Sequence, residues 1–519
     1  MGSKIIIFLL LAVGLGFFSC SSPKERSQIL RINLSSEPPT LDPRKATDVT
    51  SNNVLIMLYE GLTRIGADHT PKPALAEKIT LSENRTTYTF SLRKSLWSNG
   101  DPVTALDFER SWKQILTPSF PAPFAYKLFL IKNGAAVKKG TVPLTELGIR
   151  ALDVSTLEVT LEHPAPYFLE MLSYPLFFPL HASIDEKNPE TSPSNGPFIL
   201  KQWDHDNEIR VEKNPLYWEA SKVTLAGLKL LIVEDATTEL YMYENGELDW
   251  AGAPLSNLPT EFLPTLKAEG RVITHPSNGT YYYKINTQIP HLHNSKIRKA
   301  LAYAINRQEI VDHITQADQE IALALVPNMW DWKSQVLFKD DNKKKAQALF
   351  KEGIQELGLL SFPKTFLSFN ANREHQKIAQ AIQQMWKETF DIEIELETFD
   401  WRVYLDKLAK ENYQIARMGW LADVNDPISF LDPFKYQDGE TNGTGWENPH
   451  YISLLNASEV EIDLLTRKKL LEQAEELLID EMPIIPLYFI NFTYMKKPYV
   501  HNVFLSPLGI IDFKEAFLK

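Results

Sequence analysis

The pattern of apolar and polar positions predicts strands near the amino terminus, with short helices between them. Residues 29–34 and 85–93 alternate as half-buried strands do, and apolar residues between 49 and 59 recur at helical spacing. Further along, Thr104 can cap a helix in which Asp107, three residues later, reaches back in capping-box fashion. The first half of the chain is therefore expected to be rich in strands.

The second half changes to helices and strands in turn. An extended run at 365–370 precedes a helix with one apolar face, and residues 392–397 then alternate strictly. A strand, helix and strand in this order predict a right-handed parallel connection. Near the end, an apolar helical stripe at 470–478 precedes the apolar run 484–490. The pattern as a whole indicates an α/β protein.

Length and composition add that the chain holds more than one core. At 519 residues it exceeds the roughly 250 to 300 residues at which single cores stop growing, so two or three lobes are expected. The content of 44% hydrophobic and 23% charged residues is that of a folded globular protein. A net charge of -12 argues against nucleic acid as a partner, because its binding depends on Lys and Arg neutralising phosphates.

The amino terminus has the pattern of a secretion signal. Lys4 precedes an apolar run at 5–18, which is too short to span a bilayer and ends in small residues. We therefore expect a signal peptide at 1–19.

Cys20 follows this signal and is the only cysteine in the sequence. It ends a segment similar to a bacterial lipobox, although Phe17 stands where the lipobox usually has an aliphatic residue. We expect lipidation of Cys20 and a tether at 20–28, and the alternative is an unlipidated signal with an incidental cysteine. A single cysteine also leaves no intramolecular disulfide and no metal site built on several thiolates.

Four stretches in the mature chain carry a resemblance to a known family. The stretches are 96–108 (LWSNGDPVTALDF), 195–198 with 214–218 (NGPF and NPLYW), 281–286 (YYYKIN) and 417–423 (RMGWLAD). Each alone is a weak signal. In this order and at these separations they resemble the oligopeptide-binding proteins of bacterial ABC importers, and they cover nearly the whole mature chain.

The resemblance implies a three-lobed α/β periplasmic-binding-protein fold with a hinge and a ligand cleft between lobes. Lobe I would be discontinuous, built from 29–59, 184–278 and 490–519. Lobe II would span 60–183 and lobe III 279–489. Two crossover strands would act as the hinge on which the lobes close.

The function that the resemblance implies is extracytoplasmic capture of short peptides and their delivery to an ABC importer. The partners would be permease and ATPase subunits, and the protein would be a monomer without a cofactor, in the periplasm or cell envelope, lipid-anchored to a membrane. The same fold could instead bind murein peptides for recycling, or another solute such as a nickel complex. A secreted peptidase is the alternative from another class. The sequence has no zinc helix motif with two histidines, no Gly-x-Ser-x-Gly elbow and no catalytic cysteine, so we expect no enzyme and no metal.

The charged candidates in the cleft come from matching the family motif. Asp423 matches the aspartate that pairs with the ligand α-ammonium, and Gly419 and Trp420 precede it, where an aromatic wall would exclude water and strengthen the pair. Arg417 and His375 match positions that meet ligand carboxylates, for which the planar fork of Arg is well suited. Without the resemblance, Asp423 is better interpreted as a surface helix or loop residue, Arg417 could form a structural salt bridge, and His375 could be a solvated helix residue.

The remaining candidates are apolar or supply backbone groups. Trp401 would line a side-chain pocket together with Trp420. Val49 would offer backbone groups to a ligand held like an added strand. Phe124 and Tyr488 stand where the family commonly has tyrosines. As sequence features, these residues fit a core equally well.

Departures from the family pattern suggest a ligand preference. Lys284 stands where the best-known peptide binders have a glutamate, and Leu408 where they have an arginine. A pocket charge pair is therefore inverted or lost. This motivates the hypothesis that the ligand carries an acidic side chain or an extra carboxylate, as cell-wall peptides with glutamate and a diamino acid do.

Overall fold

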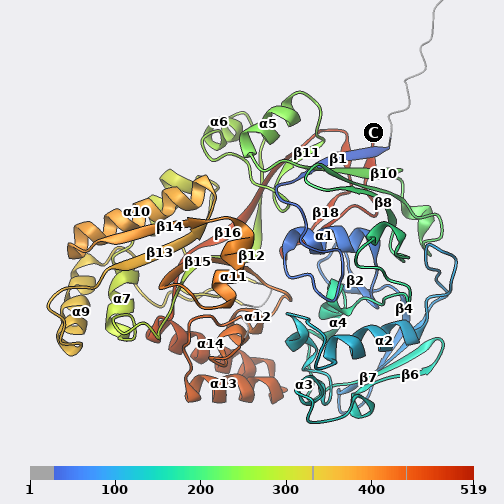
Figure 1. The fold of residues 1–519 in the computed structure, drawn as a ribbon, viewed down its shortest axis with the longest axis horizontal. Coiled ribbons are helices and arrows are strands. Elements are labelled where there is room, and N and C mark those ends of the chain that lie inside the picture. Colours follow the sequence, from blue (N-terminus) through green and yellow to red (C-terminus); the bar gives the residue numbers. More distant parts are fainter. Residues whose placement is uncertain (1–27, 330–331, 440) are drawn as a thin grey trace, which may run out of the picture.

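The computed structural model describes residues 28–329, 332–439 and 441–519, and the three largest sheets organise this part of the chain. The predicted signal peptide and Cys20 lie outside the described residues. Figure 1 shows one body on the left, coloured yellow to red, and two bodies on the right that contain the blue and green elements. The α/β fold class predicted from the sequence is confirmed by the structural comparisons reported below.

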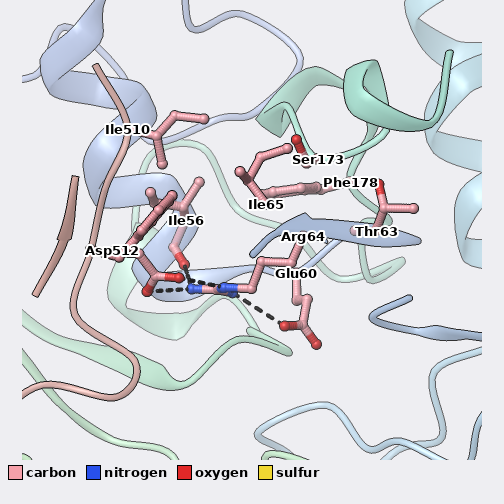
Figure 2. A pocket seen from close by; sticks show the side chains of 11 residues that line it. Ile56, Glu60, Thr63, Arg64, Ile65, Ser173, Phe178, Ile510 and Asp512 are labelled. Atoms are coloured by element: carbon pink, nitrogen blue, oxygen red, sulfur yellow. Dashed lines mark hydrogen bonds and ion pairs between the residues drawn. The ribbon is translucent and has the colours of Figure 1, made fainter. Parts of the chain in front are cut away.

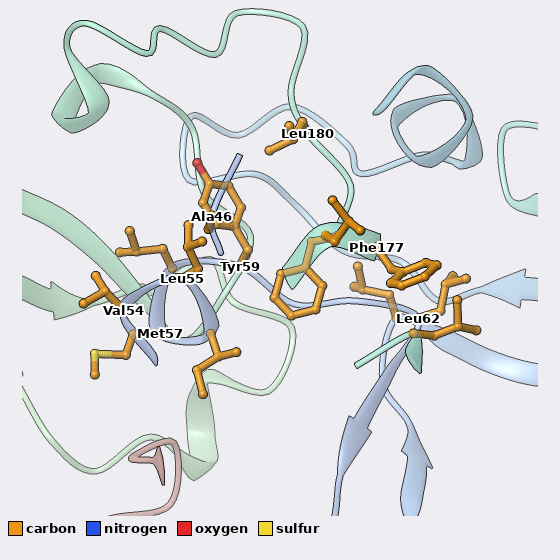
Figure 3. Close-up of a cluster of buried hydrophobic side chains, with 14 of the residues drawn as sticks. Ala46, Val54, Leu55, Met57, Tyr59, Leu62, Phe177 and Leu180 are labelled. Carbon is orange, nitrogen blue, oxygen red and sulfur yellow. The ribbon is translucent and has the colours of Figure 1, made fainter. Parts of the chain in front are cut away.

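The first sheet is mixed, because β1 pairs in parallel with β10 while the other pairs are antiparallel. Its order is β1-β10-β9-β8, with bounds Ile29–Leu34, Gly227–Ile232, Glu208–Lys213 and Phe198–Asp204. Helix α1 (Val49–Leu58) lies beside β8 and begins at Asp48, whose side chain accepts a hydrogen bond from the backbone of Ser51. Figure 3 shows Val54, Leu55 and Met57 of α1 in the same buried cluster as Phe177 and Leu62.

The second sheet is antiparallel and carries the predicted capped helix. Its order is β4-β5-β7-β6, with bounds Ala76–Leu81, Thr87–Leu92, Thr156–Thr160 and Ile149–Asp153. Helix α2 (Ala105–Leu116) packs on β6 and β7, and its capping box is present as expected, with the Thr104 N–H donating to Asp107 at 2.8 Å. Shorter helical turns follow in this region: η1 (Ala125–Leu128), α3 (Gly134–Lys138) and α4 (Phe168–Met171).

The third sheet has six strands and contains the predicted crossover. Its order is β11-β16-β12-β15-β13-β14, with bounds Trp250–Gly252, Ile484–Lys496, Ile273–Ile285, Ile415–Leu421, Thr365–Asn370 and Ile394–Phe399. Helix α10 (Arg373–Phe390) joins β13 to β14, and these two strands pair in parallel, as the sequence predicted. Strand β14 starts two residues later than expected, because α10 ends at Asp391 in the left-handed conformation and Ile392 lies in the short connection that follows.

Further helices surround the third sheet (Figure 1). They are α7 (Ser295–Tyr303), α9 (Lys343–Glu356), α11 (Trp401–Ala409), α12 (Ile428–Leu431), α13 (Pro449–Val460) and α14 (Leu464–Glu481). The apolar stripe predicted at 470–478 belongs to α14, in which Leu471, Ala474 and Leu478 are buried.

Strands β12 and β16 are long and pass from the third sheet toward the first (Figure 1). Their pairing has a shift in register between Pro276 and Thr280. On one side of the shift, Phe492 and Tyr494 belong to the core that also holds the first two sheets. On the other side, residues from Tyr281 onward belong to a separate core. We propose that the two strands form the hinge expected from the sequence, with the lobe boundaries near 279 and 489.

The carboxyl-terminal segment is joined by an ion pair to Arg64, a few residues after the end of α1. Figure 2 shows Arg64 in a pocket between Asp512 and Glu60, with Nε 2.7 Å from Asp512 and Nη1 3.2 Å from Glu60. Glu60 also accepts a hydrogen bond from the Tyr217 hydroxyl. Because Arg64 pairs with a carboxylate on each side, this cluster holds the chain end in place.

Candidate functional site

Strand alternation gathers one group of predicted residues on a single face of the third sheet. Residues directly opposite each other in neighbouring strands share a face, and Arg417 of β15 is opposite Tyr283 of β12, while Gly419 is opposite Tyr281. The Arg417 guanidinium lies 4.8 Å from the centre of the Tyr281 ring. Tyr281 in turn stacks on Tyr488 of β16, with ring centres 4.8 Å apart. Arg417, Gly419 and Tyr488 are therefore neighbours.

The first turn of α10 completes this group, which we call the Arg417 cluster. Asn372 caps the helix by accepting hydrogen bonds from the backbones of Glu374 and His375. Nδ1 of His375 lies 3.3 Å from the Tyr281 hydroxyl, and the Tyr488 hydroxyl donates to Glu374 at 3.4 Å. The cap thus places His375 beside Tyr281, whose ring Arg417 contacts.

In the Arg417 cluster, the Arg417 guanidinium keeps a positive charge that is available to bind a ligand. Burial raises the pKa of Glu374 to about 7, against the opposing effect of Arg417. Burial and the charge of Arg417 hold the pKa of His375 well below its usual value, so this imidazole is neutral. Within the described residues, no carboxylate lies within ion-pair distance of Arg417, and its Nε has no hydrogen-bond partner. The cluster can therefore receive an external carboxylate.

Asp423 lies beyond the end of β15, and Ser429 of α12 fixes its position. The Ser429 hydroxyl accepts hydrogen bonds from the backbones of Asp423 and Val424, both at 3.2 Å. The carbonyl of Ser429 accepts from the indole nitrogen of Trp420 at 2.8 Å. One residue therefore positions both Trp420 and Asp423, whose side chain is 25% exposed.

Asp423 forms an ion pair with Lys127, which the sequence did not single out. Nζ of Lys127 lies 2.5 Å from Oδ2 of Asp423, and the lysine side chain is only 4% exposed. Its ammonium lies over the rings of Phe124 and Tyr174, at 4.4 and 4.5 Å from their centres. Burial lowers the pKa of Lys127, and Asp423 opposes this effect. Phe124 therefore meets Asp423 through the lysine that lies between them.

The start of α1 also lies beside Tyr174. The amide of Asn52 donates to the Tyr174 hydroxyl at 2.8 Å, one helical turn after Val49. Val49 is the first residue of α1, so its N–H has no partner within the helix. Elements from all three expected lobes thus meet around Tyr174, and we call this the Asp423 cluster.

Two predicted residues stand apart from these clusters. Lys284 is opposite Ala416 in the sheet, so it points to the face away from Arg417, where its ammonium donates to the Thr441 carbonyl at 2.6 Å. Burial lowers the pKa of Lys284 to about 8. Contact of Lys284 with a ligand remains a prediction, to which this geometry adds no support.

Trp401 lies at the edge of the Arg417 cluster. It begins α11, is 37% exposed, and its ring centre is 6.4 Å from that of Tyr404, whose hydroxyl donates to the Arg417 carbonyl at 2.6 Å. Leu408, also in α11, packs beside Tyr404. A role of Trp401 in lining a pocket stays a prediction.

Two further contacts cross between the regions expected as lobes II and III. Glu170 accepts a hydrogen bond from the Asn425 backbone at 3.0 Å, and His163 lies 3.6 Å from Glu459. Burial raises the pKa of Glu170 to about 7. The two regions therefore touch at several points, and the Asp423 cluster lies at one of them.

Comparison with known proteins assigns the family. The model of the bacterial extracellular solute-binding proteins, family 5 middle region, matches residues 70–442. The chain belongs to this family. Its relatives include oligopeptide-binding proteins of ABC importers, and the family is one of binding proteins and not of enzymes. Among the described residues, we find no helix with the length and apolar character that crossing a membrane requires.

The similarity extends over almost the entire chain. The oligopeptide-binding protein OppA of Bacillus subtilis is 41% identical, covering 99% of this chain and 98% of the relative. The structure of Haemophilus influenzae OppA in complex with the peptide RPPGFSPFR has a TM-score of 0.87 at 28% identity, covering 95% of this chain and 99% of that one. The murein tripeptide binding protein MppA of Escherichia coli gives 0.87 at 27% identity, covering 95% and 98%. The unliganded open form of MppA gives only 0.69, at 26% identity and with coverage of 95% and 97%.

Proposed function

We propose that this protein captures short peptides between the regions expected as lobes II and III and delivers them to the permease and ATPase subunits of an ABC importer. One observation carries the proposal: strand β15 and the loop after it present two charged positions of opposite sign, each with an unused bonding site. Arg417 has no carboxylate partner within the described chain, and the ion pair with Lys127 uses Oδ2 of Asp423, so that Oδ1 can accept from a ligand. A peptide with free termini has one charge of each sign.

The spacing of the two positions fits a peptide of a few residues. Asp423 lies six positions after Arg417, which corresponds to roughly 20 Å along an extended strand. An extended peptide spans at most about 3.5 Å per residue, and the Arg417 side chain reaches part of the way. The ligand ammonium would bind Asp423 and its carboxylate would bind Arg417 or, in peptides of another length, reach His375.

Backbone pairing would supply the rest of the binding. Main-chain atoms are common to all peptides, so a ligand held like an added strand can be bound with little regard to its sequence. The unpaired N–H of Val49 is one donor for such pairing. Trp420 and Trp401 would then line the pockets that receive side chains.

Lobe closure would enclose the peptide. The contacts of Lys127 with Asp423 and of Glu170 with Asn425 join the two regions in this structure. The TM-score of 0.69 with the unliganded open form of MppA, against 0.87 with the other MppA structure, supports a closed arrangement here. The protein would act as a monomer in the periplasm or cell envelope, held to a membrane by a lipid on Cys20.

A second candidate ligand is a murein peptide. The likeness to the murein tripeptide binding protein MppA favours it, since that structure covers the whole described fold at a TM-score of 0.87. Both candidates belong to the same class of ligand and would use the same two charged positions.

Native mass spectrometry of the purified protein tests the proposal. Incubation with a mixture of di- to pentapeptides should give complexes with one intact peptide per protein, and no cleavage products. The control is the same mixture with both termini of each peptide blocked, which should give few complexes because neither charged position is used. The absence of any complex with the free peptides would contradict the proposal.

A further inference from the structure

The carboxylate proposed to hold the ligand ammonium already has an ammonium of the protein beside it. Lys127 lies 2.5 Å from Oδ2 of Asp423, and no other carboxylate in the described ranges is within ion-pair distance of this lysine. The walls around the lysine ammonium are the rings of Phe124 and Tyr174. The Asp423 cluster is therefore electrically neutral before a peptide arrives.

Binding of a peptide amino terminus disturbs this neutrality. An ammonium at Oδ1 would leave one carboxylate facing two cations, one of which, Lys127, is only 4% exposed. Asp48, whose charge also acts on Tyr174, accepts a hydrogen bond from the Ser51 backbone at the start of α1 and forms no ion pair with Lys127 within the described residues. An uncompensated charge in such surroundings is costly, so the extra cation requires a second anion.

We propose that Lys127 is a specificity-determining residue, which selects peptides carrying a carboxylate close to their amino terminus. This inference rests on the proposed function. The ligand carboxylate would pair with Lys127 while the ligand ammonium pairs with Asp423, so that two anions and two cations alternate. From the sequence, we attributed a preference for acidic ligands to Lys284. We now attribute this preference to Lys127, because Lys284 lies on the opposite face of the sheet from Arg417 and donates to Thr441.

Titration calorimetry with matched peptides tests the assignment. Glu-Ala-Ala and Ala-Glu-Ala are each compared with the counterpart in which Gln replaces Glu, so that only the charge differs. In the wild-type protein, at least one Glu peptide should bind at least tenfold more tightly than its Gln counterpart. Lys127→Met should bring that ratio to about 1, whereas Lys127→Arg, which keeps the charge, should retain it.

Further variants keep the test decisive. Lys127→Gln replaces Lys127→Met if the latter does not show the cooperative thermal unfolding of the wild type. Ratios near 1 in the wild type, or a ratio that survives both neutral variants, would overturn the inference. A ratio lost in Lys284→Met and kept in Lys127→Met would also overturn it. If the wild type binds none of the four peptides, it is the proposed function that fails.

Discussion

At the scale of single residues, the Arg417 cluster couples ligand binding to pH through Glu374. The pKa of Glu374, raised by burial to about 7, lies above its ordinary value, so the fold favours the neutral form. The other titratable groups of the cluster do not change charge near neutral pH. His375 stays neutral, and the pKa of Tyr281 is raised to about 12 by burial. Above pH 7, Glu374 is negatively charged and competes with a ligand carboxylate for the positive charge of Arg417. Below pH 7, Glu374 is neutral and does not compete.

This predicts that affinity for a peptide with a free carboxyl terminus rises roughly 3- to 10-fold as the pH falls from 8 to 6. Ionisation of Glu374 also costs stability as the pH rises through about 7, because the neutral form is the one the fold prefers. The control is Glu374→Gln, which should bind at pH 8 as the wild type does at pH 6 and lose this component of the pH dependence. Titration calorimetry at both pH values measures it, and an unchanged pH profile in the variant would refute the role of Glu374.

Some of these site residues could be predicted from the sequence and others could not, for physical reasons. Arg417, Trp420 and Asp423 share one short motif, so a family resemblance finds them together. Lys127 becomes significant only through a contact with a residue 296 positions away in the sequence, and no local pattern reports such a contact. Matching the motif did not show on which face of the sheet Lys284 lies. Tyr283, its neighbour in the strand, shares a face with Arg417, so Lys284 points to the other face.

At the scale of elements, Gly279 allows the shift in register within β12. A Cβ added at this glycine would lie 2.5 Å from Cδ2 of Leu421 and 3.2 Å from Cδ1 of Ile490, which are closer than ordinary contacts. The glycine lies where β12 changes its pairing with β16, at the start of the segment proposed as hinge. The close packing of three strands therefore depends on the absence of a side chain there.

Gly279→Val should lower the free energy of unfolding by roughly 1 to 3 kcal/mol, because the added side chain overpacks this site. The matched control is Gly419→Ala on the facing strand, where the nearest atom, Nη2 of Arg417, is at an ordinary distance of 3.4 Å. Chemical denaturation of both variants measures the difference. Equal stability of the Val variant and the wild type would show that the strands accommodate a side chain at the shift.

Local sequence patterns predicted the positions of helices and strands better than they predicted which strands pair. The capping box at Thr104 and the crossover from β13 to β14 follow from short-range patterns, and both are present. The apolar run at 484–490 gave no sign that β16 extends to Lys496, because Pro486 breaks the run and the later residues pair only with distant strands. The length of the two hinge strands therefore needed the structure.

At the scale of the whole molecule, three regions of the chain meet at one carboxylate. Asp423 comes from the third sheet and Lys127 from the region of the second sheet, and Tyr174 connects Lys127 to α1. A peptide held there contacts all three regions, so its binding would favour the closed arrangement over the open one. The proposed function depends on this convergence.

The most direct test of the account compares wild type and Asp423→Ala in titrations with one tripeptide, free or acetylated at its amino terminus. The account predicts that the substitution weakens binding of the free peptide by roughly 2 to 5 kcal/mol, because a ligand ammonium loses its partner in a closed site. Binding of the acetylated peptide should change much less. Unchanged affinity for the free peptide, or an equal loss for both peptides, would contradict the assignment of Asp423 to the ligand amino terminus.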